Sequence, residues 1–312
     1  MQKIDIVEEQ PLSLVNARSA RRRTLKYDLI PLLMTIIWGA TFLVTKDTLK
    51  LIGPFTYLSL CYLVATVTLV GIFHKRLVRI TRAELLCGLL IGIVLFAGYG
   101  LQTVGLQWAS ASQAGFLTGL YVPLVPLLSL FFLRQRIAIT AWIGVLLSLA
   151  GLFLLSVNKQ FSLSIGLGEW LLLGCAFAFA VQIVLISKFA PRMDAINLAI
   201  IQLALTAVLS LFAVPLHHEP IAAPPLLAWV PICLLGTIDM AFTLVCMNWV
   251  QQYISSTRAT LIYSLEPLWA AFFGVLVAGD TLSLIAWTGC GCIFVGMIVG
   301  RLEKIDFRRK HK

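Results

Sequence analysis

The sequence predicts an all-α polytopic membrane protein whose ten transmembrane helices form two inverted repeats of five helices each. Composition gives the first indication. Of the 312 residues, 60% are hydrophobic and 12% are charged, and the mean hydropathy is +0.94, whereas a soluble domain carries roughly 25% charged residues. The other two indications are ten long apolar runs and a long-range internal repeat.

The repeat joins a stretch that begins near Ser112 to one that begins 144 residues later, near Ser256. The offset is 144 up to the prolines and 145 after them, which places one added residue near Gly279. Five apolar runs lie within this interval, so the second copy must enter the bilayer from the opposite side. The matching pairs are Ser112 and Ser256, Pro123 and Pro267, Trp142 and Trp287, Gly144 and Gly289, and Gly151 and Gly296.

Each apolar run is close to the 20 or so residues that a spanning helix needs. Continuous runs of this kind favour helices over the short alternating segments of a strand barrel. Short polar breaks such as Lys75–Arg82 and Pro191–Asp194 separate them. The ten runs are Leu29–Leu49, Phe55–Phe73, Leu85–Gly105, Gln113–Leu133, Ala141–Val157, Glu169–Lys188, Ile196–Pro215, Leu227–Trp249, Ala259–Ala278 and Ser283–Gly300.

The chain divides into two halves, at residues 28–157 and 168–301, joined by a polar connector at residues 158–167. A polar tail at residues 1–27 lacks the apolar core of a signal peptide, so we expect it to be cytoplasmic and disordered. A short basic tail follows at residues 302–312.

The positive charges favour one orientation. If the N-terminus is cytoplasmic, 21 of the 24 Lys and Arg residues lie on the cytoplasmic side, and only Lys46, Lys50 and Lys159 lie outside. The positive-inside rule therefore predicts a multi-pass protein of the bacterial inner membrane with both termini in the cytoplasm. The basic excess needs no nucleic-acid partner, and membrane lipids are the expected partners of the basic tails.

Two carboxylates lie deep in the second half. Glu266 is about eight residues into its run and Asp239 is central in its own, whereas the corresponding positions of the first half hold Val122 and Leu95. An unpaired ionised carboxylate there costs several kcal/mol, so each must be protonated, paired or turned toward a polar cavity. If the two face each other they could share a proton, which would suit proton coupling. Alternatively, Glu266 is a structural group bonded to a neighbouring helix.

Proline residues are expected to interrupt two of the helices. Pro267 has no amide hydrogen, which leaves the carbonyl of Tyr263 without its helical donor, and Pro123 and Pro126 act in the same way in the first half. Free carbonyls in mid-membrane are tolerated where they line a cavity. Arg258, at the end of the helix that carries Glu266, is expected to be an interface anchor.

Neutral polar and aromatic residues deep in the spans are candidates for a solute pathway. For any one of them, a hydrogen bond between helices worth about 0.6 kcal/mol is an equally good explanation. With Glu266 they are Trp38, Thr41, Tyr99, Gln102, Gln182, Asn248, Tyr263 and Trp269, and Thr103 and Gln202 belong to the same class.

Enzymatic and metal chemistry have little support. The seven cysteines have no ligand spacing, and His217, His218 and Glu219 are consecutive residues, which rarely face one ion. No phosphate-binding glycine loop is present, so we expect no cofactor, no metal and no catalytic site.

Three sets of residues carry a family resemblance: Trp38–Phe42, Ala109–Phe116 with Gly119–Pro126, and Ser255–Ala259 with Ser264–Pro267. Together they resemble the EamA-type members of the drug/metabolite transporter superfamily. Trp38–Phe42 (WGATF) is similar to the opening signature of that family. Ala109–Phe116 with Gly119–Pro126 resembles its fourth helix, and Ser255–Ala259 with Ser264–Pro267 resembles its ninth. The resemblance spans residues of about 28–301.

This resemblance implies two inverted five-helix repeats, a central cavity, and movement of small metabolites such as amino acids, often outward. Two positions depart from the pattern. Cys61 stands near a position where many relatives carry an arginine, so we transfer no carboxylate-binding role to that helix. Thr281 stands where a Gly-Glu pair often closes the ninth helix.

The resulting hypothesis is a secondary transporter, an exporter of small polar or amphipathic metabolites that works by alternating access, with or without proton coupling through Glu266 and Asp239. The alternative is a non-transporting membrane scaffold or lipid-handling protein that kept the fold. A monomer is compatible with the sequence.

Overall fold

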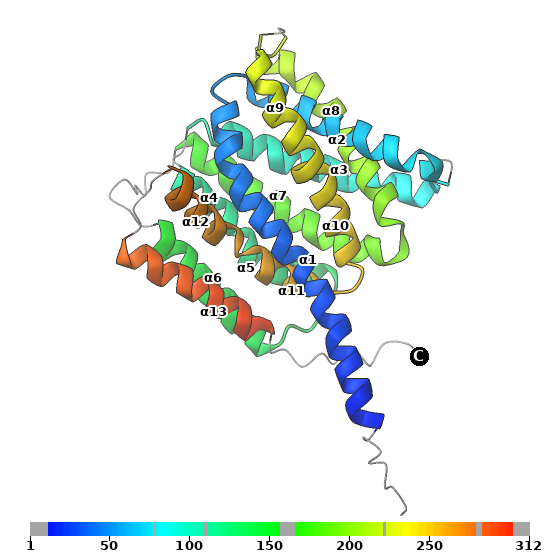
Figure 1. Ribbon diagram of the computed structural model, residues 1–312, viewed down its shortest axis with the longest axis vertical. Coiled ribbons are helices and arrows are strands. Elements are labelled where there is room, and N and C mark those ends of the chain that lie inside the picture. Colours follow the sequence, from blue (N-terminus) through cyan, green and yellow to red (C-terminus); the bar gives the residue numbers. More distant parts are fainter. Residues whose placement is uncertain are drawn as a thin grey trace, which may run out of the picture.

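The computed structural model describes residues 12–77, 79–108, 111–156, 166–220, 223–278 and 283–301, and within these ranges its regular structure is helical (Figure 1). The helices pack side by side in one bundle, and the first part of α1 projects from it. The elements are α1 (Leu12–Thr48), α2 (Pro54–Leu77), α3 (Arg82–Gly105), α4 (Ala111–Gly119), α5 (Tyr121–Phe132), α6 (Ile139–Ser156), α7 (Leu167–Phe189), η1 (Ala190–Arg192), α8 (Ala195–Leu216), α9 (Leu226–Leu234), η2 (Leu235–Phe242), α10 (Thr243–Val250), α11 (Ser256–Tyr263), α12 (Glu266–Ala278) and α13 (Leu284–Arg301).

Within the described residues, eight helical segments are long and apolar enough to cross a membrane. The fifth and tenth predicted runs form shorter apolar helices, Ile139–Leu155 and Leu284–Gly300. The long segments are Tyr27–Thr48, Pro54–Leu77, Arg82–Gly105, Ala114–Phe132, Leu167–Arg192, Ala195–Leu216, Leu226–Val250 and Ser256–Val277.

Helix α1 corrects one expectation. It begins at Leu12, so residues 12–27 are helical, whereas the sequence predicted a disordered tail. Leu, Ala, Arg and Lys are good helix formers, and no proline falls between residues 12 and 27 to end a helix. Residues 1–11 and 302–312, and the predicted connector up to residue 165, lie outside the described part of the chain.

The fourth and ninth of the predicted runs are interrupted in the middle. Helix α4 ends at Gly119, the residue whose carbonyl would have bonded to the missing amide hydrogen of Pro123. Helix α11 ends at Tyr263, which stands in the same relation to Pro267. Each span then continues as a second half-helix, α5 or α12. Pro126 lies inside α5 and does not end it.

Helices α6 and α13 lie against each other along their length (Figure 1). Glycines make the close approach possible: a Cβ built on Gly151 would lie 2.5 Å from the carbonyl oxygen of Gly289, and one on Gly144 would lie 2.6 Å from that of Gly296. Small residues commonly allow such backbone contact between membrane helices. The two shorter apolar helices therefore form one tightly packed pair.

Two buried carboxylates hold the helix ends around α2, α3 and α8. Glu219 accepts the amide hydrogens of Phe55 and Thr56, both at 2.8 Å, and so caps α2 from a distant loop. Glu84, at the start of α3, accepts the amide hydrogen of Asp194 at 3.0 Å, next to the start of α8. Because Glu219 is engaged in this cap, it serves a structural purpose in the described chain.

The two ends of the bundle are named here by residues of α1. The Tyr27 end contains Tyr27 of α1 and the last residues of α2, and the Thr48 end contains Thr48 and the first residues of α2. Large apolar side chains such as Leu226 and Leu284 are more than four-fifths exposed on the outside, as expected of a surface that faces lipid.

Candidate functional site

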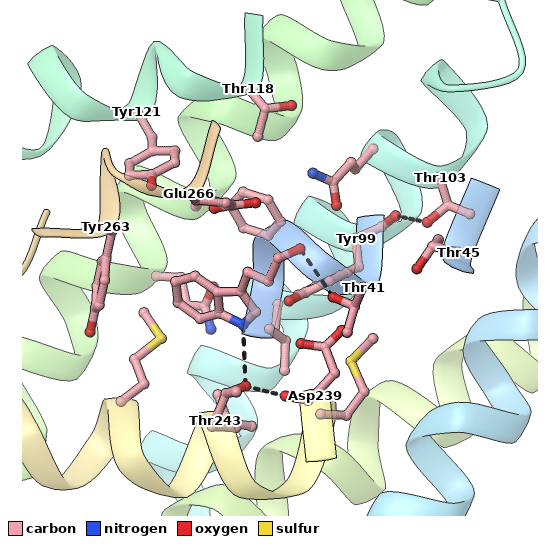
Figure 2. A pocket seen from close by; sticks show the side chains of 18 of the residues that line it. Thr41, Thr45, Tyr99, Thr103, Thr118, Tyr121, Asp239, Thr243, Tyr263 and Glu266 are labelled. Atoms are coloured by element: carbon pink, nitrogen blue, oxygen red, sulfur yellow. Dashed lines mark hydrogen bonds between the residues drawn. The ribbon is translucent and has the colours of Figure 1, made fainter. Parts of the chain in front are cut away.

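A cavity of about 110 Å³ lies inside the bundle (Figure 2). It reaches from the middle of the bundle, where the half-helices meet, toward the Thr48 end, because Thr45, Tyr57 and Leu106 contribute to its wall. Its lining residues are Trp38, Thr41, Thr45, Tyr57, Tyr62, Leu95, Tyr99, Gln102, Thr103, Leu106, Thr118, Tyr121, Phe179, Gln182, Ile183, Asp239, Met240, Thr243, Leu244, Met247, Tyr263 and Glu266.

Glu266 reaches the cavity because its span is broken. It is the first residue of α12, directly after the break that follows Tyr263. The amide groups at a helix start carry a partial positive charge, so a carboxylate is favoured at this position. Tyr121, the first residue of α5, occupies the corresponding place in the other broken span and also lines the cavity.

Asp239 lies in η2, a stretch of π-helix within the helical segment Leu226–Val250. Stretches of this kind often mark functional sites. Trp38 donates through Nε1 to the hydroxyl of Thr243 at 3.3 Å, and that hydroxyl donates to the main-chain oxygen of Asp239. The side chain of Asp239 lies beside Thr41, and its Oδ1 is buried without a hydrogen-bond partner in the described structure.

The two carboxylates therefore belong to one site. Figure 2 shows Glu266 and Asp239 entering the cavity from different walls, Glu266 from the start of α12 and Asp239 from η2. No hydrogen bond joins their side chains among the bonds found in the described residues, so the geometry is that of two separate acidic groups around one space. A directly shared proton remains a prediction.

The structure brings most of the predicted pathway residues together. Besides Glu266 and Asp239, the cavity wall contains Trp38, Thr41, Tyr99, Gln102, Gln182 and Tyr263, and also Thr103.

Three of the candidate residues, Asn248, Gln202 and Trp269, lie outside the wall. Asn248 is fully buried and accepts a hydrogen bond of 3.1 Å from Gln202, so it joins α10 to α8. Trp269 lies behind the wall and packs against α1, because a Cβ built on Gly39 would lie only 2.5 Å from the Cβ of Trp269. All three sit deep in their predicted spans, but the sequence does not show which side of the helix faces the cavity.

Several wall residues were not singled out from the sequence. Aromatic rings of Tyr57, Tyr62, Tyr121 and Phe179 contribute to the wall, as do the hydroxyls of Thr45, Thr118 and Thr243. A spacing of four residues could have found some of them, because Thr45 follows Thr41 and Thr243 follows Asp239 on the same helix face.

The charges of the wall have a single sign. Asp239 and Glu266 are acidic, and no Lys, Arg or His is among the lining residues that the structure describes.

Contacts of α1 with α10, α11 and the turn between them close the bundle at the Tyr27 end. Arg258 donates from Nε and Nη2 to the carboxylate of Asp28, at 2.9 and 2.6 Å. The ring of Tyr27 stacks on Tyr253 with centroids 4.3 Å apart and lies 5.5 Å from that of Trp249. These contacts tie α1 to α10 and α11 between the cavity and this end.

Comparison with known proteins gives matches over nearly the whole described chain. The sequence model of the EamA-like transporter family matches twice, at residues 25–157 and at residues 166–300.

Two similar relatives match over most of their own length. An uncharacterized transporter of Archaeoglobus fulgidus is 30% identical, over 87% of this chain and 84% of its own length. The uncharacterized inner membrane transporter YedA of Escherichia coli K12 is 25% identical, over 88% of this chain and 90% of its own length. A crystal structure with 21% sequence identity has the same fold, with a TM-score of 0.75 over 89% of this chain and 98% of that chain.

Proposed function

Because this chain belongs to the EamA-like transporter family, we propose that it is a secondary transporter that moves a small organic solute across the membrane by alternating access. The observation that carries the proposal is the cavity, which lies where two interrupted spans meet and holds two buried carboxylates. Transporters built from repeats commonly place their solute site at such a junction of discontinuous helices.

Ten spans in two inverted repeats are part of this proposal. The family model matches the chain once in each half, and α6 and α13, the fifth and tenth helices, pack as a pair. The interruption between α4 and α5 has its counterpart between α11 and α12. These correspondences support two rocking halves around the cavity.

We propose that the carboxylates couple transport to protons. Glu266 and Asp239 have no basic neighbour in the described wall, and an ionised carboxylate without a partner is costly in a membrane interior. Binding a proton or a positively charged group neutralises them, so either event changes which state of the cavity is favoured. The positive-inside distribution of Lys and Arg supports cytoplasmic termini in the inner membrane, and export is the direction we propose.

Flux measurements in sealed vesicles test this function. A growth-rescue screen against toxic amino acids, amines and related metabolites first supplies the solute. We expect Glu266→Gln to remove most of the flux and to flatten its pH dependence, whereas Glu169→Gln, the same change at a capping residue outside the wall, leaves both unchanged. Unaltered flux and pH dependence in Glu266→Gln would contradict the proposal.

A further inference from the structure

The cavity wall combines acidic side chains with aromatic rings and lacks a positive partner for an anion. Two carboxylates, Asp239 and Glu266, share the space, and the described wall contributes no Lys, Arg or His. A solute carboxylate would therefore find no charged donor, and it would be repelled by two groups of its own sign. In a medium of low dielectric constant this repulsion is much stronger than in water.

Aromatic rings surround the same space. Tyr99 meets Tyr62 and Phe179 edge to face, with centroids 5.7 and 5.1 Å apart, and Trp38 meets Tyr263 in the same way at 5.2 Å. A cation over the face of such a ring gains about 0.5–2 kcal/mol. Rings that are held by one another need little ordering when the solute arrives.

One carboxylate oxygen also lacks a protein partner. Asp239 is 6% exposed, and its Oδ1 makes no hydrogen bond within the described structure. A buried polar atom without a partner is costly, and natural sites rarely leave one unless a ligand or water completes it. An ammonium group in the cavity would supply both the missing donor and the missing positive charge.

We propose that the solute of this transporter is an organic cation, an amine or a quaternary ammonium compound with an apolar part. Its charged group lies between Asp239 and Glu266, and its apolar part lies against the rings of Trp38, Tyr99 and Tyr263. This inference rests on the proposed function of the cavity as the transport site. It narrows the solute class, because amino acids with a free carboxylate fit the wall poorly.

Binding to the purified full-length chain in detergent tests the proposal. Choline and benzyltrimethylammonium are the cationic probes, 3,3-dimethylbutanol is the neutral isostere of choline, and phenylacetate is an anionic aromatic probe. We expect calorimetry to show binding of at least one of the cations and no binding of either the isostere or the anion. Equal binding of choline and its isostere, binding of phenylacetate alone, or no binding of either cation would overturn the proposal.

Variants locate the binding site. We expect Asp239→Asn and Glu266→Gln each to weaken cation binding by roughly tenfold or more, equivalent to about 1.4 kcal/mol. Asp47→Asn, a matched change at a carboxylate that is paired with Lys50 and exposed, leaves binding unchanged. Thermal unfolding of each variant shows whether it still folds. The comparison of choline with 3,3-dimethylbutanol uses the unaltered chain, so it holds even if a variant does not fold. Wild-type affinity in both cavity variants would overturn the assignment.

The proposal and the transport function fail in different ways. If the chain carries a neutral or anionic solute in sealed vesicles, the transport function stands and the organic cation is wrong. If no solute crosses and the cavity is closed to water from both sides, both are wrong.

Discussion

Asp28 and Arg258 lie 230 residues apart in the chain, yet they form a two-point ion pair that joins α1 to α11 at the Tyr27 end of the bundle. Their side chains are 7% and 15% exposed, respectively. Together with the rings of Tyr27 and Tyr253, the pair closes the bundle between the cavity and this end. A transporter that alternates must open this closure, so the pair has consequences for both stability and conformation.

Removing one member of the pair should destabilise the closed conformation. We expect Arg258→Ala to lower the free energy of unfolding by about 1.5–3 kcal/mol, because it removes the two charged hydrogen bonds that the carboxylate of Asp28 accepts from the guanidinium. Lys50→Ala is the control, since the pair of Lys50 with Asp47 is 69% and 74% exposed and such a pair contributes about 0–1 kcal/mol. Equal losses in denaturant titrations of the two variants would contradict this expectation.

The α6 and α13 interface should tolerate no added side chain on its inner face. A Cβ on Gly289 would lie 2.6 Å from the carbonyl oxygen of Gly151, whereas one on Gly291 meets nothing within 4 Å. We expect Gly289→Ala to lower the free energy of unfolding by about 1–3 kcal/mol, because the added methyl group forces the two helices apart. We expect Gly291→Ala to leave the free energy of unfolding unchanged or to raise it by up to about 1 kcal/mol, because alanine favours a helix more than glycine does.

Thermal unfolding of these two alanine variants, made on the same helix, measures the difference directly. If Gly289→Ala unfolds at the temperature of Gly291→Ala, the helices do not pack as described.

Asn248 should matter for stability and not for the solute. Its side chain bonds to Gln202 at 3.1 Å and to the carbonyl of Leu244 at 2.8 Å, away from the cavity wall. We expect Asn248→Ala to lower the free energy of unfolding by about 0.6–1.7 kcal/mol, the range of interhelical hydrogen bonds in a membrane, with unchanged probe binding. Gln102 lies in the wall, so we expect Gln102→Ala to weaken probe binding and to leave the free energy of unfolding unchanged. A large loss of binding in Asn248→Ala would return Asn248 to the pathway.

The sequence predicts the positions of the apolar helices well, because runs of about 20 apolar residues favour a helix that can span a membrane. Eight such segments are long enough to span within the described chain, and the fifth and tenth runs form shorter helices. It also predicts where the fourth and ninth spans are interrupted, since Pro123 and Pro267 each remove one backbone donor. The π-helical stretch around Asp239 is different. Neither proline nor a polar gap marks it, and its geometry depends on packing against neighbouring helices.

Long-range partners are also beyond what the sequence alone predicts. The pairing of Arg258 with Asp28 and the cap that Glu219 places on α2 join segments 230 and 163 or more residues apart. Periodicity places a residue on a helix face, but it does not say which helix that face meets. Depth in the sequence therefore predicts Asn248 and Trp269 as cavity residues, although both lie outside the wall.

The central claim, that the cavity is a solute pathway open to each side in turn, is tested most directly by thiol labelling of Thr41→Cys in a chain whose seven native cysteines have been replaced. A membrane-impermeant reagent is added to sealed right-side-out and inside-out vesicles, with Leu198→Cys, which is fully buried and outside the wall, as the dry control. We predict that Thr41→Cys reacts in both kinds of vesicle. We also predict that a bound cation raises the labelling rate in one kind and lowers it in the other. A cysteine there that stays as unreactive as Leu198→Cys from either side would contradict transport and favour a scaffold that kept the fold.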